Sequence, residues 1–471
     1  MRGLSFWVVV FILVFSPLPF ASVRPVWSHL YAVLVAVGLL AYVFDRWRAG
    51  RAMPGVPWPL GIAGTLMALV AFWGYLQAVP GLFPAWQHPV WAETAGVLGD
   101  PDLKGYLSLT PERTLTVATN YLSYIGFGLL VVWHARRQRN VELLLKIFVA
   151  AQAGYALYGL SVYFSGLETI LWFDKTAYQG VLTSTFVNRN SYATYAGLGV
   201  LASLVLVLRY LRQTLVAEKS HRTRLREFIE TLTSRGWLPP MVMLMCFVAV
   251  LLTGSRMGLT AMLVASSLLL AAWTARLQHG QARTLGSLLL GVLLGLLVFN
   301  FVLSGALTTE RFSRLFEDGD GRFLVYPLML DAISERPWTG YGLGSFESAF
   351  RLFRDGSVTA FFDRGHNDYL ELVMDVGWPA ALMVFLAVAL LFFFAWYLSR
   401  RRADYEYALL SVAATTQIAI HSSVDFSMQM PAVVFAYLCI ALLGLAHWSR
   451  GDVSSVRIAE MDRAPRRPAL A

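Results

Sequence analysis

Long apolar runs set the strongest constraint on what this chain can fold into. Runs of about 17–25 residues recur along most of its length, and they match the hydrocarbon thickness of a bilayer. Hydrophobic residues make up 57% of the sequence and charged residues only 14%, whereas about a quarter of the residues in soluble domains are charged. A backbone in lipid must satisfy its polar groups internally. The sequence therefore predicts an all-α polytopic membrane protein.

We expect about twelve transmembrane helices separated by short loops, with one long loop between the ninth and tenth. The predicted spans lie near residues 4–22, 26–45, 56–77, 114–134, 141–165, 191–208, 238–254, 257–275, 285–304, 379–398, 408–424 and 432–448. The predicted divisions are spans one to nine in 1–304, the long loop in 305–378, spans ten to twelve in 379–448, and a tail in 449–471.

The net charge of +9 follows the expected topology. Basic residues gather in the loops after every second span, as at 46–51, 136–139 and 400–402. Cytoplasmic loops carry such an excess of arginine and lysine. Both termini are then cytoplasmic, the first segment is an uncleaved helix, and the long loop faces outward. This pattern accounts for the positive charge without a nucleic-acid partner.

The long loop is a soluble-looking stretch between apolar spans, with seven arginines and no lysine. Its apolar spacing predicts a helix from Arg322 to about Glu335, ended by Arg336-Pro337. Further helices are expected at 345–354 and from residue 365 or 366 to 376. Amphipathic helices of this kind lie on the outer membrane surface or cap the bundle.

Outward arginines from separate parts of the chain are candidates for one anion site. The guanidinium fork suits phosphate oxygens, and a lipid-linked diphosphate would place its phosphates at headgroup level. The alternative is that these side chains anchor at the interface or pair with nearby carboxylates, which we favour for Arg336, Arg351 and Arg354. The proposed diphosphate-binding residues are Arg189, Arg256, Arg311, Arg314 and Arg322.

A single histidine of the long loop, His366, is the candidate base. It follows Gly365 at an expected helix start, where the helix dipole disfavours imidazolium and leaves a neutral base. Such a base could remove the proton of a sugar hydroxyl. His421 and Asp425, four residues apart on one expected helix face, form a second candidate pair or a structural hydrogen bond. No metal-binding motif or cofactor fingerprint is present, so we expect neither metal nor cofactor.

Residues of the long loop resemble the signature of the O-antigen ligase family. The family's Arg-x3-Leu element is matched by Arg311 to Leu315. Its second element is a His-Asn pair followed, after nine further residues, by Gly, and this element is matched by His366-Asn367 and Gly377. Ala380 departs from the last signature position. Segments 186–190, 253–258 and 337–346 also look like family segments, and the resemblance covers roughly 180–430.

The resemblance implies a metal-independent, inverting glycosyltransferase in a bacterial inner membrane, with its active site facing the periplasm. The donor would be a glycan on undecaprenyl diphosphate, and the acceptor a sugar hydroxyl of lipid A–core or another glycan. His366 would activate the acceptor, and the arginines would hold the diphosphate. Asn188, Asn367 and Asp425 would support them.

Three other functions use the same features differently. A polymerase would join the same donor to a second lipid-linked glycan, and a protein oligosaccharyltransferase would transfer the glycan to protein. A transporter of the lipid-linked glycan would instead carry paired charges deep within several helices. Most expected spans lack such charges, which favours a transferase.

Overall fold

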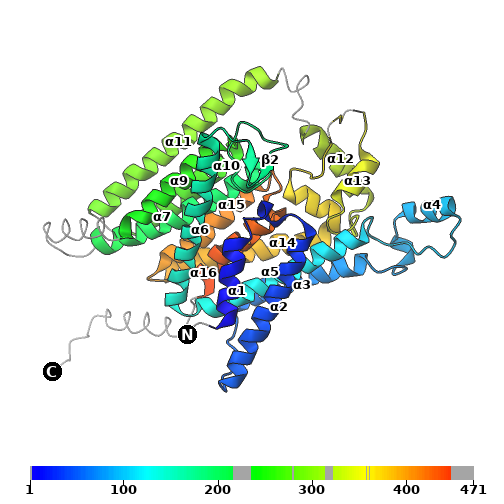
Figure 1. The fold of residues 1–471 in the computed structure, drawn as a ribbon, viewed down its shortest axis with the longest axis horizontal. Helices are drawn as coiled ribbons and strands as arrows, with labels where there is room; N and C mark the ends of the chain where they lie inside the picture. The colour runs from blue at the N-terminus through cyan, green and yellow to red at the C-terminus, as the bar shows by residue number, and fades with distance from the viewer. Residues whose placement is uncertain are drawn as a thin grey trace, which may run out of the picture.

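A computed structural model describes residues 3–215, 235–277, 280–312, 322–356, 358–359 and 361–446. Helices dominate these ranges, and one two-stranded antiparallel ribbon pairs Thr169 with Asp174 (Figure 1). The elements are α1 (Leu4–Phe15), η1 (Phe20–Ser22), α2 (Pro25–Arg48), α3 (Trp58–Gln77), η2 (Pro84–Trp86), α4 (Pro89–Leu98), α5 (Pro111–Ala135), α6 (Gln138–Phe164), β1 (Thr169–Ile170), β2 (Phe173–Asp174), α7 (Arg189–Leu215), η3 (Arg235–Trp237), α9 (Leu238–Leu252), α10 (Arg256–Ala275), α11 (Gln281–Phe312), α12 (Arg322–Glu335), α13 (Phe346–Phe353), α14 (Asp368–Arg401), α15 (Tyr405–His421), η4 (Ser427–Gln429) and α16 (Pro431–Ala446).

The helices confirm the all-α, multi-pass membrane architecture. Within the described ranges, 8 helices are long and apolar enough to cross a bilayer: α2, α3, α5, α6, α7, α10, α11 and α14. Shorter apolar helices lie at Leu4–Phe15, Leu238–Leu252 and Pro431–Leu445. Each span expected from the sequence overlaps one of the described helices, α15 included. The full count of twelve spans and the domain divisions stay predictions.

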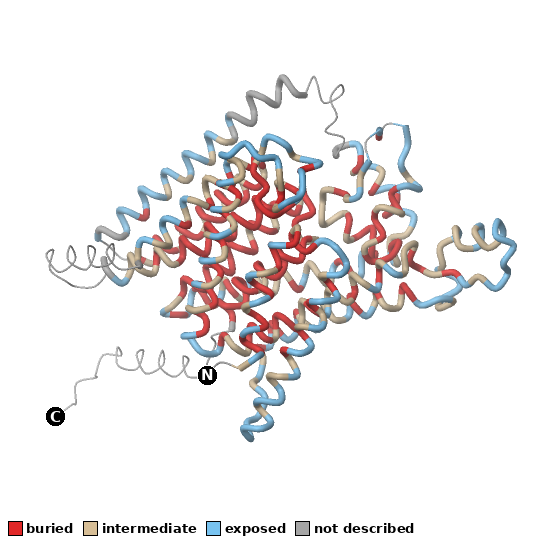
Figure 2. The backbone as a smooth tube through the Cα atoms, viewed as in Figure 1, coloured by how far each residue is buried: buried red, intermediate tan, exposed pale blue. Residues whose placement is uncertain are grey.

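The main core lies where α5, α7, α10, α15 and α16 pack together (Figure 2). Large side chains such as Phe127, Tyr195 and Trp273 are almost fully buried there. At the edge of the bundle, α11 packs along α10 and exposes Val292, Val298 and Phe299. Exposed apolar residues on a spanning helix are expected to face lipid.

A second, smaller core lies beneath α12 and α13 (Figure 2). Met329 of α12 and Phe346 and Phe350 of α13 are buried with Val70 of α3 and Ala118 of α5. The sequence predicted both loop helices, and their described bounds agree with it closely. The long loop therefore caps the bundle at α3 and α5.

The third loop helix and the tenth span form one element, α14, with a break at Gly377. Gly377 has φ 76° and ψ 166°, outside the helical region. The N–H of Trp378 donates to the carbonyl of Pro337 over 2.8 Å, so the chain that precedes α13 fills the break. A side chain at residue 377 would meet that chain, because an added Cβ would lie 2.4 Å from the Trp338 carbonyl oxygen.

We expect Gly377→Ala to destabilise the protein by about 1–3 kcal/mol, because alanine is strained at this φ and collides with Trp338. Its thermal unfolding midpoint in detergent should fall. The matched control is Gly291→Ala in α11, where an added Cβ meets nothing within 4 Å. Equal midpoints for the two variants would contradict this interpretation of the break.

Candidate functional site

The site begins at the first turn of α7, which Asn188 caps. Its Oδ1 accepts the N–H groups of Asn190 at 2.6 Å and Ser191 at 3.3 Å. A side-chain oxygen in this position satisfies N–H groups that the helix leaves without partners. The cap places Arg189 as the first residue of α7, where the helix dipole adds partial positive charge.

The first turn of α10 is also capped by a side-chain oxygen. The Oγ of Ser255 accepts the N–H of Gly258 at 3.2 Å, so Arg256 is the first residue of its helix. The preceding Gly254 has φ +63°, and a Cβ there would lie 3.5 Å from Nη1 of Arg189. The guanidinium of Arg189 therefore lies against the turn that leads to Arg256. The structure therefore places one predicted arginine beside the turn that precedes another.

The Arg189 side chain is only partly satisfied by its neighbours. Its guanidinium lies 5.6 Å from the centre of the Tyr178 ring. Its Nε is buried and has no hydrogen-bond partner among the described residues. The start of α7 therefore presents a partly exposed arginine at the positive end of a helix dipole, where a phosphate could add hydrogen bonds.

The other predicted arginines are not tested by the structure. Arg314 lies outside the described residues. Arg311 is in the last turn of α11 and Arg322 begins α12, and the surroundings of their side chains lie outside what the structure describes. Their role in binding a diphosphate stays a prediction.

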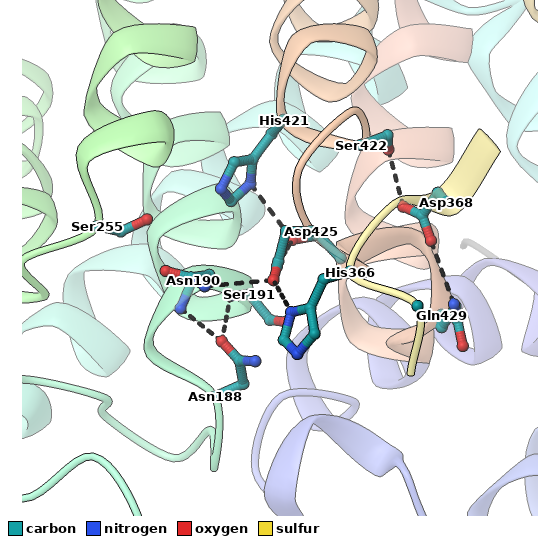
Figure 3. A network of polar contacts seen from close by, with 12 residues as sticks. Asn188, Asn190, Ser191, Ser255, His366, Asp368, His421, Ser422, Asp425 and Gln429 are labelled. Carbon is teal, nitrogen blue, oxygen red and sulfur yellow. Dashed lines mark hydrogen bonds and ion pairs between the residues drawn. The ribbon is translucent and has the colours of Figure 1, made fainter. Parts of the chain in front are cut away.

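The carboxylate of Asp425 joins α7 to the segment that carries His366 (Figure 3). Asp425 is fully buried. Its Oδ1 accepts Nδ2 of Asn190 at 3.2 Å, and its Oδ2 accepts the Ser427 hydroxyl at 2.9 Å. The same Oδ1 lies 3.6 Å from Nδ1 of His366. This last distance is longer than a hydrogen bond, so the contact is electrostatic.

His366 is held through its backbone and by two aromatic rings that pack against its imidazole. The hydroxyl of Tyr326, in α12, donates to the His366 carbonyl at 2.9 Å. The ring packs edge-on against Phe426, with centroids 4.9 Å apart, and against Phe362. The backbone has φ +50°, a left-handed conformation that costs about 1–3 kcal/mol in a residue with a side chain. The surrounding contacts therefore fix the imidazole in one place.

Electrostatics keep Asp425 ionised despite its burial. Burial alone would raise the pKa of its carboxyl, but the interactions with His366, His421 and the Ser427 hydroxyl outweigh it and lower the pKa below the usual value. A carboxylate beside Nδ1 orients the imidazole so that Nε2 can accept a proton, and it stabilises the imidazolium that forms. The pair can therefore act as an oriented base.

Two expectations about these residues were wrong. His366 does not begin the helix: α14 starts at Asp368, and Asn367 caps it by accepting the N–H groups of Tyr369 and Leu370 at 3.1 Å. His421 and Asp425 do not share a helix face, because α15 ends at His421. The reason is that the chain turns after α15, so that His421 contacts Thr194 of α7 while Asp425 reaches His366.

Sequence reasoning missed a row of acids on one face of α14: Asp368, Glu371 and Asp375. Glu371 accepts the N–H of Gly365 at 2.6 Å and so positions the residue before His366. Asp368 accepts the Ser422 hydroxyl at 2.8 Å. The spacing i, i+3, i+7 next to an apolar span is the signal that could have revealed them, because buried carboxylates there are costly without partners.

Comparison with known proteins adds one finding. Residues 241–385 match the family model described as O-antigen ligase. This segment is similar to the O-antigen ligase family. The match confirms the resemblance that the sequence motifs indicated, and it includes Arg256, His366 and the whole long loop. It supports a membrane glycosyltransferase of the ligase and polymerase type. No curated protein matches the chain.

Metal ligands do not gather in the described part of the chain. Across those ranges, no group of three or more His, Cys, Asp or Glu residues could hold a metal ion. The cysteines, Cys246 and Cys439, are both buried within helices and unpaired with each other. The described site holds a histidine–carboxylate pair, which Asn190 connects to the first turn of α7.

Proposed function

We propose that this protein transfers a glycan from undecaprenyl diphosphate to a sugar hydroxyl at the periplasmic face of a bacterial inner membrane. The acceptor we favour is lipid A–core, which makes the reaction an O-antigen ligation. The observation that carries the proposal is the proximity of His366 and Asp425 to the start of α7, through the hydrogen bond between Asp425 and Asn190. That bond links a base to a cationic site.

In the proposed reaction, the acceptor hydroxyl attacks the anomeric carbon of the donor directly. Its proton passes to Nε2 of His366, and Asp425 stabilises the imidazolium. A new glycosidic C–O bond forms while the bond from the anomeric carbon to the diphosphate breaks. Undecaprenyl diphosphate leaves with the electron pair, and Arg189 and Arg256 stabilise its growing charge. One displacement inverts the anomeric carbon.

The identity of the acceptor distinguishes O-antigen ligation from polymerisation, which is the nearest alternative. A polymerase would use the same donor and the same base but would take a second lipid-linked glycan as acceptor. Purified protein in liposomes can be given the donor with lipid A–core, or the donor alone. Product on lipid A–core supports ligation, whereas lengthened lipid-linked glycan identifies a polymerase, and no product with either acceptor contradicts the proposed transfer.

We expect His366→Asn to reduce kcat by about 10²–10⁴, the usual contribution of a general base, with the KM for the donor nearly unchanged. Asparagine is chosen because it tolerates the left-handed backbone at this position better than alanine. The measurement is glycan transfer by protein whose unfolding midpoint matches the parent. Normal turnover would contradict the role of His366.

Arg189→Gln and Arg256→Gln should each weaken binding of undecaprenyl diphosphate by about tenfold or more, since each removes a charged phosphate contact. Binding can be followed by native mass spectrometry of the purified protein. The matched control is Arg351→Gln, because that arginine is exposed on α13 and pairs with Glu347 at 2.7 Å. Similar affinities for all three variants would place the diphosphate elsewhere.

A further inference from the structure

A large cavity runs along α14 on the side of the bundle formed by α2, α3 and α5. Its volume is about 1240 Å³, beyond the range of about 300–1,000 Å³ that is usual for small-molecule pockets. From Val384 to Phe393 of α14, its lining is apolar, and Leu60, Met67 and Leu442 face the same space. This part of the cavity lies at the level of membrane-spanning helices and suits a hydrocarbon chain.

The other end of the cavity is polar, and its lining includes Arg364 and Asp368, on either side of His366 in the chain, but not His366 itself. Arg113, Arg364, Glu371 and Asp375 line it near the first turns of α14. The Glu371 carboxylate accepts the N–H of Gly365, the residue before His366. Residues suited to a polar headgroup and residues suited to a hydrocarbon chain therefore line opposite ends of one cavity.

Asp375 leaves one polar atom at this end of the cavity without a partner among the described residues. The residue is only 5% exposed. Its Oδ2 accepts the N–H of Gly344 at 2.7 Å, while its buried Oδ1 has no hydrogen-bond partner among the described residues. A buried carboxylate oxygen without a donor is costly. A hydroxyl group of a ligand in the cavity would supply that donor.

The cavity is separate from the two arginines that start α7 and α10. Neither Arg189 nor Arg256 is among its lining residues, whereas Asp368, Ser422 and Gln429 are. In Figure 3, His366 and Asp425 lie between Asn190 and Ser255 on one side and Asp368 and Gln429 on the other. The base therefore lies between the cationic site and the polar end of the cavity.

We propose that this cavity binds the acyl chains of the lipid acceptor and presents its sugar to His366. The inference rests on the proposed function, in which two lipid-anchored substrates must be bound at once. The arginines hold the donor by its diphosphate, so the second hydrocarbon anchor needs its own place. The apolar length of α14 takes the chains, and Asp375 and Glu371 accept hydrogen bonds from sugar hydroxyls. Arg113 and Arg364 offer charge to headgroup phosphates.

A substitution that fills the cavity without disturbing packing tests this assignment. Gly64 of α3 lines the cavity, and an added Cβ there meets nothing within 4 Å. Gly64→Trp therefore places an indole in the space proposed for the acyl chains. Gly61→Trp is the matched control, because Gly61 lies one turn earlier on α3, is exposed, does not line the cavity and also has free space around an added Cβ.

We expect Gly64→Trp to raise the KM for lipid A–core by about tenfold or more, since the indole excludes the chains, while the KM for the donor stays near the parent value. Gly61→Trp should leave both values unchanged. Core oligosaccharide freed of lipid A should be used equally by the parent and Gly64→Trp, because it has no chains to exclude.

Several outcomes would overturn the assignment. An unchanged KM for lipid A–core means that the chains bind elsewhere. A raised KM for the donor means that the cavity holds the polyprenyl chain of the donor instead. An equal loss with the free core oligosaccharide means that the indole disturbs the site and not the chains. A parent protein that transfers glycan to no acceptor refutes the proposed function itself, and this result is seen before any variant is made.

Discussion

The buried charge of Asp425 is the interaction on which the end of the bundle that carries His366 depends. A carboxylate removed from water costs several kcal/mol unless its surroundings supply donors and positive charge. Here Asn190 comes from α7, Ser427 from η4 and His366 from the segment before α14. Three segments far apart in the sequence must therefore meet at one side chain. The position of the imidazole follows from that requirement.

The surrounding structure gives this imidazole two different neighbourhoods. On one side, the starts of α7 and α10 combine helix dipoles with Arg189 and Arg256. On the other, the cavity along α14 changes from carboxylates and arginines to hydrocarbon. The long loop supports the boundary between them, because its small core rests on α3 and α5 and its Tyr326 holds the His366 carbonyl. The proposed reaction joins two lipid-anchored molecules, and two separate sites would accommodate both of them.

Local sequence patterns predicted much of the fold. The features that depend on contacts between distant segments could not be predicted in this way. Apolar length located the helices, and Arg336-Pro337 marked the end of α12. The sequence also singled out Arg189, Arg256, His366 and Asp425, because ionisable side chains close to the hydrocarbon region are costly without partners. It placed His421 and Asp425 on one helix face, whereas α15 ends at His421 and the turn that follows also brings Asp425 to His366. The expected helix ended at 376 and the next span began at 379, which agrees with the break at Gly377. That residues 337–339 fill this break was not predictable, because only the packing of distant segments reveals it.

The central claim is that His366 and Asp425 act as one unit in transfer. A double-mutant cycle tests it most directly, using His366→Asn, Asp425→Asn and the combined variant with donor and lipid A–core in liposomes. The account predicts that the combined variant is no slower than the slower single variant, because removing either partner already removes the oriented base. Losses that multiply would show that the two residues act independently and would contradict it.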